Sequence, residues 1–249
     1  MQYFTLTRPK TTDHPYALIM GALAILFHTL SFHGTFLTGA GLHVGIYNIS
    51  SLIGWLIVII VISSSLRKPL ENLYIGVYPL AALSVVLAIV NQDLTQPLFQ
   101  PGLKMASHII LSVVAYSVLT IAALQSLLLA IQDHHLHHKI TNSLIMNLPP
   151  LQVMEKLLFE VIWVGFILLA SAIITGFIFI EDIFAQHLVH KTALSILAWT
   201  IFSILLLGRH RLGWRGTTAI RYTLAGYTLL MLAFIGTKLV LEVILQRAG

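Results

Sequence analysis

The chain has 249 residues, of which 57% are hydrophobic and only 9% charged, and its mean hydropathy is +0.90. Because soluble domains carry about 25% charged residues, this composition excludes a soluble globular protein and indicates an integral membrane protein with several spans. The net charge of +5 gives no support for nucleic-acid binding, since the basic residues lie in short segments between apolar runs, and the absence of cysteine excludes disulfides, thiolate catalysis and iron–sulfur clusters.

Seven apolar runs are long enough to cross a bilayer, because a spanning helix needs about 20 apolar residues, each rising about 1.5 Å. The first run exceeds the roughly 7–15 residues of a signal-peptide core, so we expect it to be retained as a span. We therefore predict one all-α integral membrane domain over residues 1–249, a transmembrane helical bundle with spans at about 16–37, 45–66, 70–91, 105–132, 157–180, 190–208 and 219–245.

Basic residues alternate with the predicted spans and set the expected orientation. They collect at the N-terminus and around the segments that follow the second, fourth and sixth spans, as Arg8, Lys10, Arg67, Lys68, Lys139, Lys156, Arg209, Arg211 and Arg215. The segments after the first and fifth spans hold no basic residue, and the one after the third holds only Lys104. Because basic residues collect on the cytoplasmic side of membranes, we expect a cytoplasmic N-terminus and an outer C-terminus.

With this orientation, histidines of the first, fourth and sixth spans gather near the outer face. His28 lies in the outer half of the first span, His108 in the first turns of the fourth, and His190 in the first turn of the sixth. The end of the first span and the outer loops add three more, His33, His43 and His187. Ionisable residues inside a span are costly and point to function, which singles out His28 and His108.

This outer group of histidines has several interpretations. Histidine is common at membrane interfaces, where it forms hydrogen bonds without binding a ligand. Neutral imidazole is also the usual axial ligand of haem iron, so two histidines on separate helices are able to hold a porphyrin between them. The same residues suit zinc or copper, or proton relay, and the residues alone leave these alternatives open.

A second histidine-rich segment, "DHHLHHK", ends the fourth span on the expected cytoplasmic side. His134 and His138 are four residues apart, a spacing that allows two side chains on one helical face to share a metal ion. At a helix C-terminus, however, polar and cationic side chains also suit the exposed carbonyls and the helix dipole. We favour this second interpretation.

The seventh span carries Lys238 and Glu242 one helical turn apart, where they are able to pair with each other. Alternatively, Lys238 snorkels outward or meets an anionic group. The sequence offers no Ser–His–Asp arrangement, phosphate-binding loop or paired-carboxylate motif. It thus gives no support for a hydrolase or a nucleotide-driven protein, and we expect no enzymatic activity.

Three stretches carry a resemblance to a known family: "HIILSVVAYSVLTIAALQSLLLA", "LPPLQVMEKLLFEVIWVGFILLASAIITGFIF", and the C-terminal region with "HKTALSILAW" and "GRHRLGWRG". Over nearly all of residues 16–245 the chain resembles the cytochrome c assembly protein family, in its branch of small bacterial inner-membrane proteins of the YpjD and HemX type. The resemblance is most specific in "HKTALSILAW" and in the turn formed by Gly213, Trp214, Arg215 and Gly216.

The resemblance implies an inner-membrane protein that binds or handles haem in cytochrome complex assembly, with a b-type haem held non-covalently. His108 matches the histidine that opens one family helix, and His190 matches the one that opens the helix before "GWRG". Both are therefore expected axial ligands of haem iron. His28 is a further candidate, and Lys238 is an optional partner for the haem carboxylates. The expected partners are the lipid bilayer, haem and other membrane proteins of cytochrome or haem biogenesis, and no nucleic acid.

Two features depart from the family pattern. Larger members hold haem on a tryptophan-rich outer segment, but the corresponding loop here is "IEDIFAQHLV", which argues against delivery of haem to an apocytochrome. Relatives also carry a further N-terminal span, so we expect either another apolar run upstream of Met1 or a protein of seven spans.

Two other functions stay open beside haem handling. One is a haem-free regulatory or interaction protein that acts on tetrapyrrole biosynthesis or on a neighbouring membrane complex, as the missing tryptophan-rich segment favours. The other is a transporter of ions or small solutes, which is less favoured because the sequence shows no inverted repeat and no pair of broken helices.

Overall fold

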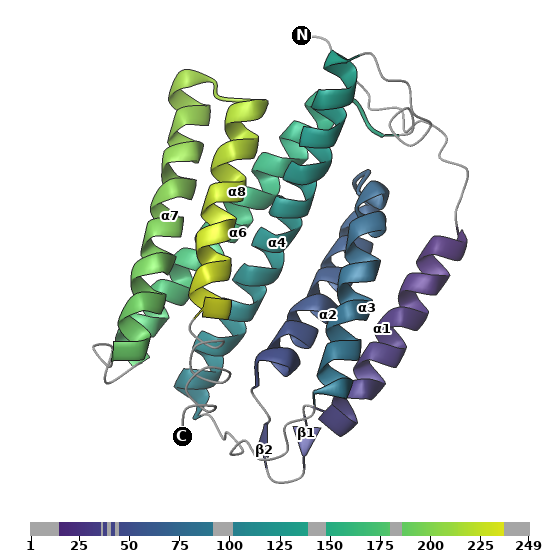
Figure 1. Ribbon diagram of the computed structural model, residues 1–249, viewed down its shortest axis with the longest axis vertical. Helices are drawn as coiled ribbons and strands as arrows, with labels where there is room; N and C mark the ends of the chain where they lie inside the picture. Colours follow the sequence, from purple (N-terminus) through teal and green to yellow (C-terminus); the bar gives the residue numbers. More distant parts are fainter. Residues whose placement is uncertain are drawn as a thin grey trace.

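The computed structural model describes residues 15–35, 37–38, 41–42, 45–91, 102–138, 148–179 and 186–236. In this part of the chain the regular elements are helices, apart from a hairpin of two-residue strands, β1 (Leu37–Thr38) and β2 (Gly41–Leu42). The helices are α1 (Pro15–Thr35), α2 (Ile46–Ser65), the 3-10 turn η1 (Glu71–Leu73), α3 (Tyr74–Val90), α4 (Leu103–His137), α6 (Leu151–Phe179), α7 (Gln186–Leu212), α8 (Thr217–Met231) and the π-helical turn η2 (Leu232–Gly236) (Figure 1).

Each predicted apolar run coincides with one of these helices, which confirms the prediction of an all-helical membrane protein. Within the described residues, five helical segments have the length and hydropathy of membrane spans: Ile46–Ser65, Glu71–Val90, Leu103–His137, Leu151–Phe179 and Val189–Leu212. The apolar part of α1, Leu18–Phe32, is shorter, and the last helix is described only as far as Gly236. The count of seven spans therefore stays a prediction.

The predicted spans 105–132, 157–180 and 190–208 are each shorter than the helix observed, and α7 extends beyond its prediction at both ends. α4 continues to His137 rather than ending near 132, and α6 begins at Leu151 rather than near 157. An apolar run measures the thickness of the hydrocarbon core, whereas a helix continues beyond it wherever its backbone bonds can form. The carbonyl of Pro150 accepts hydrogen bonds from the N–H groups of Val153 and Met154 and so starts α6. Proline suits a helix start, where its missing N–H costs no bond.

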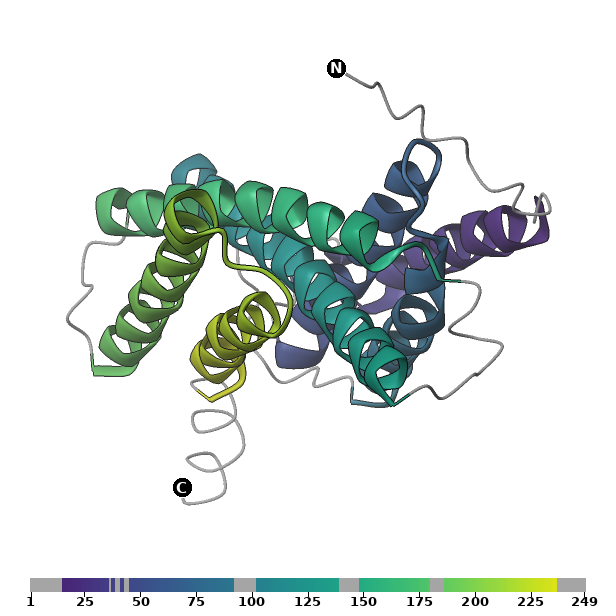
Figure 2. The same ribbon diagram turned by 90° about the horizontal axis from the view of Figure 1, so that it is seen from above.

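α4 lies at the centre of the bundle. Every side chain from Ala115 to Ala123 is buried, as expected for a helix that is covered on all sides. α4 packs along α6 and also contacts α2 and α8, while α1 and α3 pack on α2, and α7 packs on α8 and α6 (Figures 1 and 2). Two apolar clusters result, one among α4, α6, α7 and α8, and one between α2 and α3 with side chains of α4 and α6.

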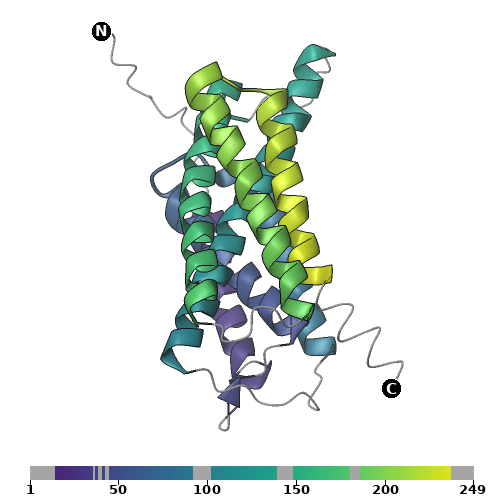
Figure 3. The ribbon, with the colours of Figure 1, turned by 90° about the vertical axis from the view of Figure 1, so that its left-hand side faces the viewer.

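The helices run alternately up and down, so their ends gather at two ends of the bundle (Figures 1 and 3). The last turns of α1 and the first turns of α4 and α7 lie at the bottom of Figure 1, at what we call the histidine end. The opposite end holds the α2–α3 turn, the last turns of α4 and the α7–α8 turn. We call it the basic end, after its described residues Arg67, Lys68, Arg209, Arg211, Arg215 and Arg221.

At the basic end, one arginine of "GRHRLGWRG" ties α7 to α6. Nη1 of Arg209 donates to Oε1 of the buried Glu155 at 2.8 Å and to the carbonyl of Trp214 at 3.1 Å. The same guanidinium lies 4.7 Å from the centroid of the Phe159 ring, a cation–π distance. A second ion pair, between Lys68 and Glu160, is more exposed.

Glycines and a tryptophan shape the turn between α7 and α8. Trp214 covers Gly208 so closely that a Cβ at that position would overlap the indole ring. Gly213 and Gly216 have φ angles of 66° and 56°, which residues with a Cβ rarely adopt. The segment "GRHRLGWRG" therefore forms an architectural turn that fixes α7 and α8 against α6.

Candidate functional site

His108 lies in the second turn of α4, half-buried against the last part of α6. Its Nδ1 atom is 3.2 Å from the hydroxyl oxygen of Thr175 on α6. Gly176, the next residue of α6, makes room for the imidazole, because a Cβ there would lie 3.0 Å from Cε1 of the ring. The packing of α4 on α6 therefore fixes the position of this ring.

The hydrogen bonds of Thr175 determine which nitrogen of His108 carries the proton. The Thr175 hydroxyl donates to the carbonyls of Ser171 and Ala172, at 2.9 and 3.0 Å, so its lone pair accepts a hydrogen bond from the imidazole. Nδ1 of His108 is thus the N–H donor, and in neutral imidazole Nε2 then keeps its lone pair. A histidine held at one nitrogen by such a partner is oriented for metal ligation through the other.

A lysine that the sequence analysis did not single out accompanies His108. Lys191, in the first turns of α7, lies close enough to act electrostatically on the His108 ring. Its side chain is half-buried. The residue follows His190 in "HKTALSILAW", so only the packing of α7 at the histidine end could show which of the two neighbours faces α4. This cation is suited to a carboxylate near His108.

His190 is at the same end of the bundle as His108, but its side chain is exposed. Among the described residues it has no hydrogen-bond partner. The structure therefore brings the second turn of α7 close to His108, with Lys191 as the neighbouring side chain and His190 at the surface beside it.

His28 is buried at the interface between α1 and α2, away from His108. Its Nε2 lies 2.8 Å from the hydroxyl of Ser51, and its ring centroid lies 5.2 Å from that of Phe32. Ile49 and Ile53 pack on the cluster that contains α4, and Ser51, two residues from each, lies about 160° around α2 from both. His28 thus faces the side of α2 that points away from α4, and the structure does not bring it together with His108.

Several other predicted positions lie outside the described residues. They are His43, Lys238 and Glu242, together with the side chains of His33 and His187.

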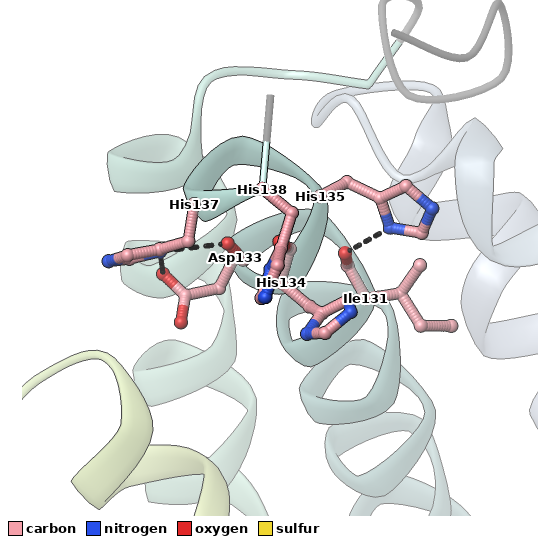
Figure 4. A network of polar contacts seen from close by, with 6 residues as sticks. All are labelled: Ile131, Asp133, His134, His135, His137 and His138. Atoms are coloured by element: carbon pink, nitrogen blue, oxygen red, sulfur yellow. Dashed lines mark hydrogen bonds and ion pairs between the residues drawn. The ribbon is translucent and has the colours of Figure 1, made fainter. Parts of the chain in front are cut away.

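Three of the four histidines of "DHHLHHK" bond to carbonyls of their own helix (Figure 4). Nδ1 of His135, His137 and His138 each lies 2.8–2.9 Å from the carbonyl four residues earlier. These carbonyls belong to the last two turns of α4, and that of His134 also accepts the backbone N–H of His138 at 3.1 Å. Throughout the described part of the chain, no group of three or more His, Asp or Glu side chains is arranged to hold a metal ion.

Comparison with known proteins gives a consistent relationship. The family model described as cytochrome c assembly protein matches residues 16–245. The chain is 31% identical over 234 residues to the inner membrane protein YpjD of Escherichia coli strain K12, covering 92% of this chain and 87% of that protein, with the same values for YpjD of Escherichia coli O157:H7. It is 34% identical over 147 residues to a 28.8 kDa protein of Azospirillum brasilense, covering 58% of this chain and 54% of that protein. No solved structure matches the chain.

The match extends over almost all of the helical bundle, including the helices that carry His108 and His190 and the "GWRG" turn. The apolar helices and the similarity to YpjD agree on a multi-pass protein of the bacterial inner membrane. This chain belongs to the cytochrome c assembly protein family.

Proposed function

We propose that this protein handles haem in the inner membrane during cytochrome c biogenesis, without enzymatic activity of its own, and that His108 would hold the haem through its iron. The observation that carries the proposal is the hydrogen bond between His108 and Thr175, which leaves Nε2 with a free lone pair on a ring of fixed orientation. The expected topology, with seven spans and a cytoplasmic N-terminus, puts the histidine end at the outer face.

The residues near His108 suit haem chemically. Haem needs a neutral imidazole nitrogen for its iron, apolar contacts for the porphyrin and cations for its propionates. Nε2 of His108 supplies the first, and Lys191 supplies a cation beside it. About two helical turns further into the bundle from Lys191, Trp199 of α7 stacks on Phe166 of α6, with ring centroids 5.0 Å apart. When bound, haem would supply an iron centre for redox or transfer chemistry.

His190 is the candidate for a second residue that would hold the haem, because it lies at the same end of the bundle and is exposed. His28 is a weaker candidate than the sequence suggested, since its Nε2 already bonds Ser51 on the other side of α2. We therefore expect His108 to be indispensable for haem binding, His190 to contribute, and His28 to act on stability.

Absorption spectroscopy of the purified protein tests this proposal. We expect a Soret band after expression with haem supply, loss of the band in His108→Ala, and a shifted or weaker band in His190→Ala. His210→Ala is the matched control, because His210 is an exposed residue at the other end of α7. An unchanged Soret band in His108→Ala would contradict the assignment.

A regulatory protein that binds no haem is the second candidate. The absence of tryptophan from "IEDIFAQHLV" and the exposure of His190 favour it. Purified protein without a Soret band under haem-replete conditions would support this candidate, which acts instead on tetrapyrrole biosynthesis or on a neighbouring membrane complex.

A further inference from the structure

We propose that the basic end binds the phosphate of an anionic phospholipid headgroup in a groove between the last turns of α4 and the first turns of α8. The groove has a volume of about 420 Å³. Two helices line it, α4 with Ala130, Asp133, His134, His137 and His138, and α8 with Thr217, Ile220 and Arg221. The site is separate from the histidine end and does not depend on haem.

Arg221 supplies the permanent positive charge of the groove. Its side chain is exposed and makes no hydrogen bond or ion pair with another described residue. Guanidinium groups bind phosphate oxygens through two parallel N–H donors. Asp133, the one acid among the described lining residues, has a carboxylate oxygen 3.5 Å from Nδ1 of His137, so its negative charge lies against that imidazole. Among the described residues, the groove therefore presents to an anion a cation that no carboxylate neutralises.

The imidazoles add donors on the α4 side. His134 and His138 lie next to each other, with ring centroids 4.2 Å apart and an interplanar angle of 35°, whereas His135 points away (Figure 4). Nδ1 of His138 bonds the carbonyl of His134. The ring of His134 itself has no hydrogen-bond partner among the described residues, so either neutral tautomer offers an N–H to a phosphate oxygen.

The α8 side provides a hydroxyl and the start of a helix. Thr217 lines the groove at the first position of α8. No side chain caps this helix start, since Gly216 occupies the N-cap. These groups reinforce the attraction for an anion that Arg221 establishes, because the first N–H groups of a helix carry partial positive charge.

A metal ion fits the groove less well than a phosphate. A pair of histidines four residues apart is able to bind zinc or copper, but no third His, Asp or Glu of the described residues completes a metal site. Arg221 lines the same groove and would repel a divalent cation.

The depth of the groove favours a lipid over a soluble phosphate. α4 has 35 residues and is about 52 Å long, against a hydrocarbon core of about 30 Å, so its last turns reach the headgroup region. The floor of the groove includes Ala130 and Ile220. One and two turns before His134, Ile131 and Leu127 are 48% and 46% exposed. The phosphate-binding groups of the groove thus lie within two helical turns of exposed aliphatic side chains on α4. Basic pockets between spanning helices that bind lipid headgroups combine these two features.

Native mass spectrometry of the full chain in detergent, titrated with phosphatidylglycerol or phosphatidylcholine, tests the proposal. We expect the natural protein to retain phosphatidylglycerol more tightly than phosphatidylcholine. Arg221→Gln should retain phosphatidylglycerol about fivefold more weakly, the loss expected for one cation near an anionic headgroup. His134→Ala should also weaken this retention. The control is Arg211→Gln, because Arg211 is exposed at the same end of the bundle but does not line the groove; its retention should stay within about twofold.

Three results would overturn the proposal. An equal loss in Arg221→Gln and Arg211→Gln, or no preference for phosphatidylglycerol, would each mean that the groove recognises no headgroup. Displacement of the lipid by millimolar glycerol phosphate would assign the groove to a soluble phosphate. Unchanged melting temperatures of all variants would show that the effects come from binding and not from folding.

Discussion

Nδ1 of His108 on α4 lies 3.2 Å from the hydroxyl of Thr175 on α6, and this contact joins residues 67 positions apart in the chain. It orients the imidazole and leaves Nε2 as the nitrogen with a lone pair. Partners of this kind orient ligating histidines and raise their basicity. The ligand assignment therefore depends on a residue pair that neither helix specifies alone.

Thr175→Val should weaken haem binding by about 10- to 100-fold, the usual effect of removing a group that orients a metal-ligating histidine. Haemin titration followed at the Soret band measures the change. Thr175→Ser keeps the hydroxyl and should restore most of the affinity, and Thr200→Val, at an exposed position on α7, serves as the control. Wild-type affinity in Thr175→Val would show that the hydrogen bond does not orient the ligand.

Glu155→Ala should destabilise the protein by about 3 kcal/mol, because it leaves Arg209 without its buried carboxylate partner. Glu160→Ala is the matched comparison. It breaks the ion pair between Lys68 and Glu160, whose side chains are 47% and 39% exposed. This change should cost at most about 1 kcal/mol. Thermal unfolding in detergent measures both variants. Equal shifts of the melting temperature would contradict the central role given to Arg209 in the α7–α8 turn.

Gly208→Ala and Gly76→Ala should change stability in opposite directions. A Cβ at Gly208 overlaps the Trp214 indole, so overpacking should cost about 1–3 kcal/mol. At Gly76 the added Cβ meets only Leu124, at 3.6 Å, and alanine in a helix gains up to about 1 kcal/mol over glycine. The same thermal unfolding assay compares them, and a stable Gly208→Ala variant would show that the indole does not need to lie on α7.

The natural absence of cysteine allows a direct test of the proposed orientation. Leu103 at the histidine end and Leu212 at the basic end are 89% and 70% exposed, so each accepts a single cysteine without repacking the bundle. A membrane-impermeant maleimide added to spheroplasts should label Leu103→Cys directly and Leu212→Cys only after lysis. The reverse pattern would put His108 on the cytoplasmic side.

The lengths of the apolar runs predicted most of the helices. Each predicted span corresponds to a helix, because the hydrocarbon core demands a continuous apolar run that can be counted in the sequence. The extension of α4 to His137 escaped this count, since "QDHHLH" is polar and lies beyond the apolar core.

Side-chain partners between helices could not be predicted from one sequence. His28 looked like a ligand because it is ionisable within a span, but the structure directs it toward Ser51 on the far side of α2. The sequence does not show that Lys191, and not its neighbour His190, faces His108. The ion pair of Arg209 with Glu155 joins residues 54 positions apart. Each of these contacts depends on which faces of two helices meet, and the hydrophobic pattern of highly apolar helices does not specify that.

Chemical rescue of His108→Gly tests the central claim most directly. This variant removes the imidazole, and the purified protein should lack a Soret band. Exogenous imidazole should restore the band in His108→Gly, whereas it should not restore haem to a variant that has lost its fold. A Soret band in His108→Gly equal to that of the natural protein without imidazole would contradict the assignment of His108 as the haem ligand.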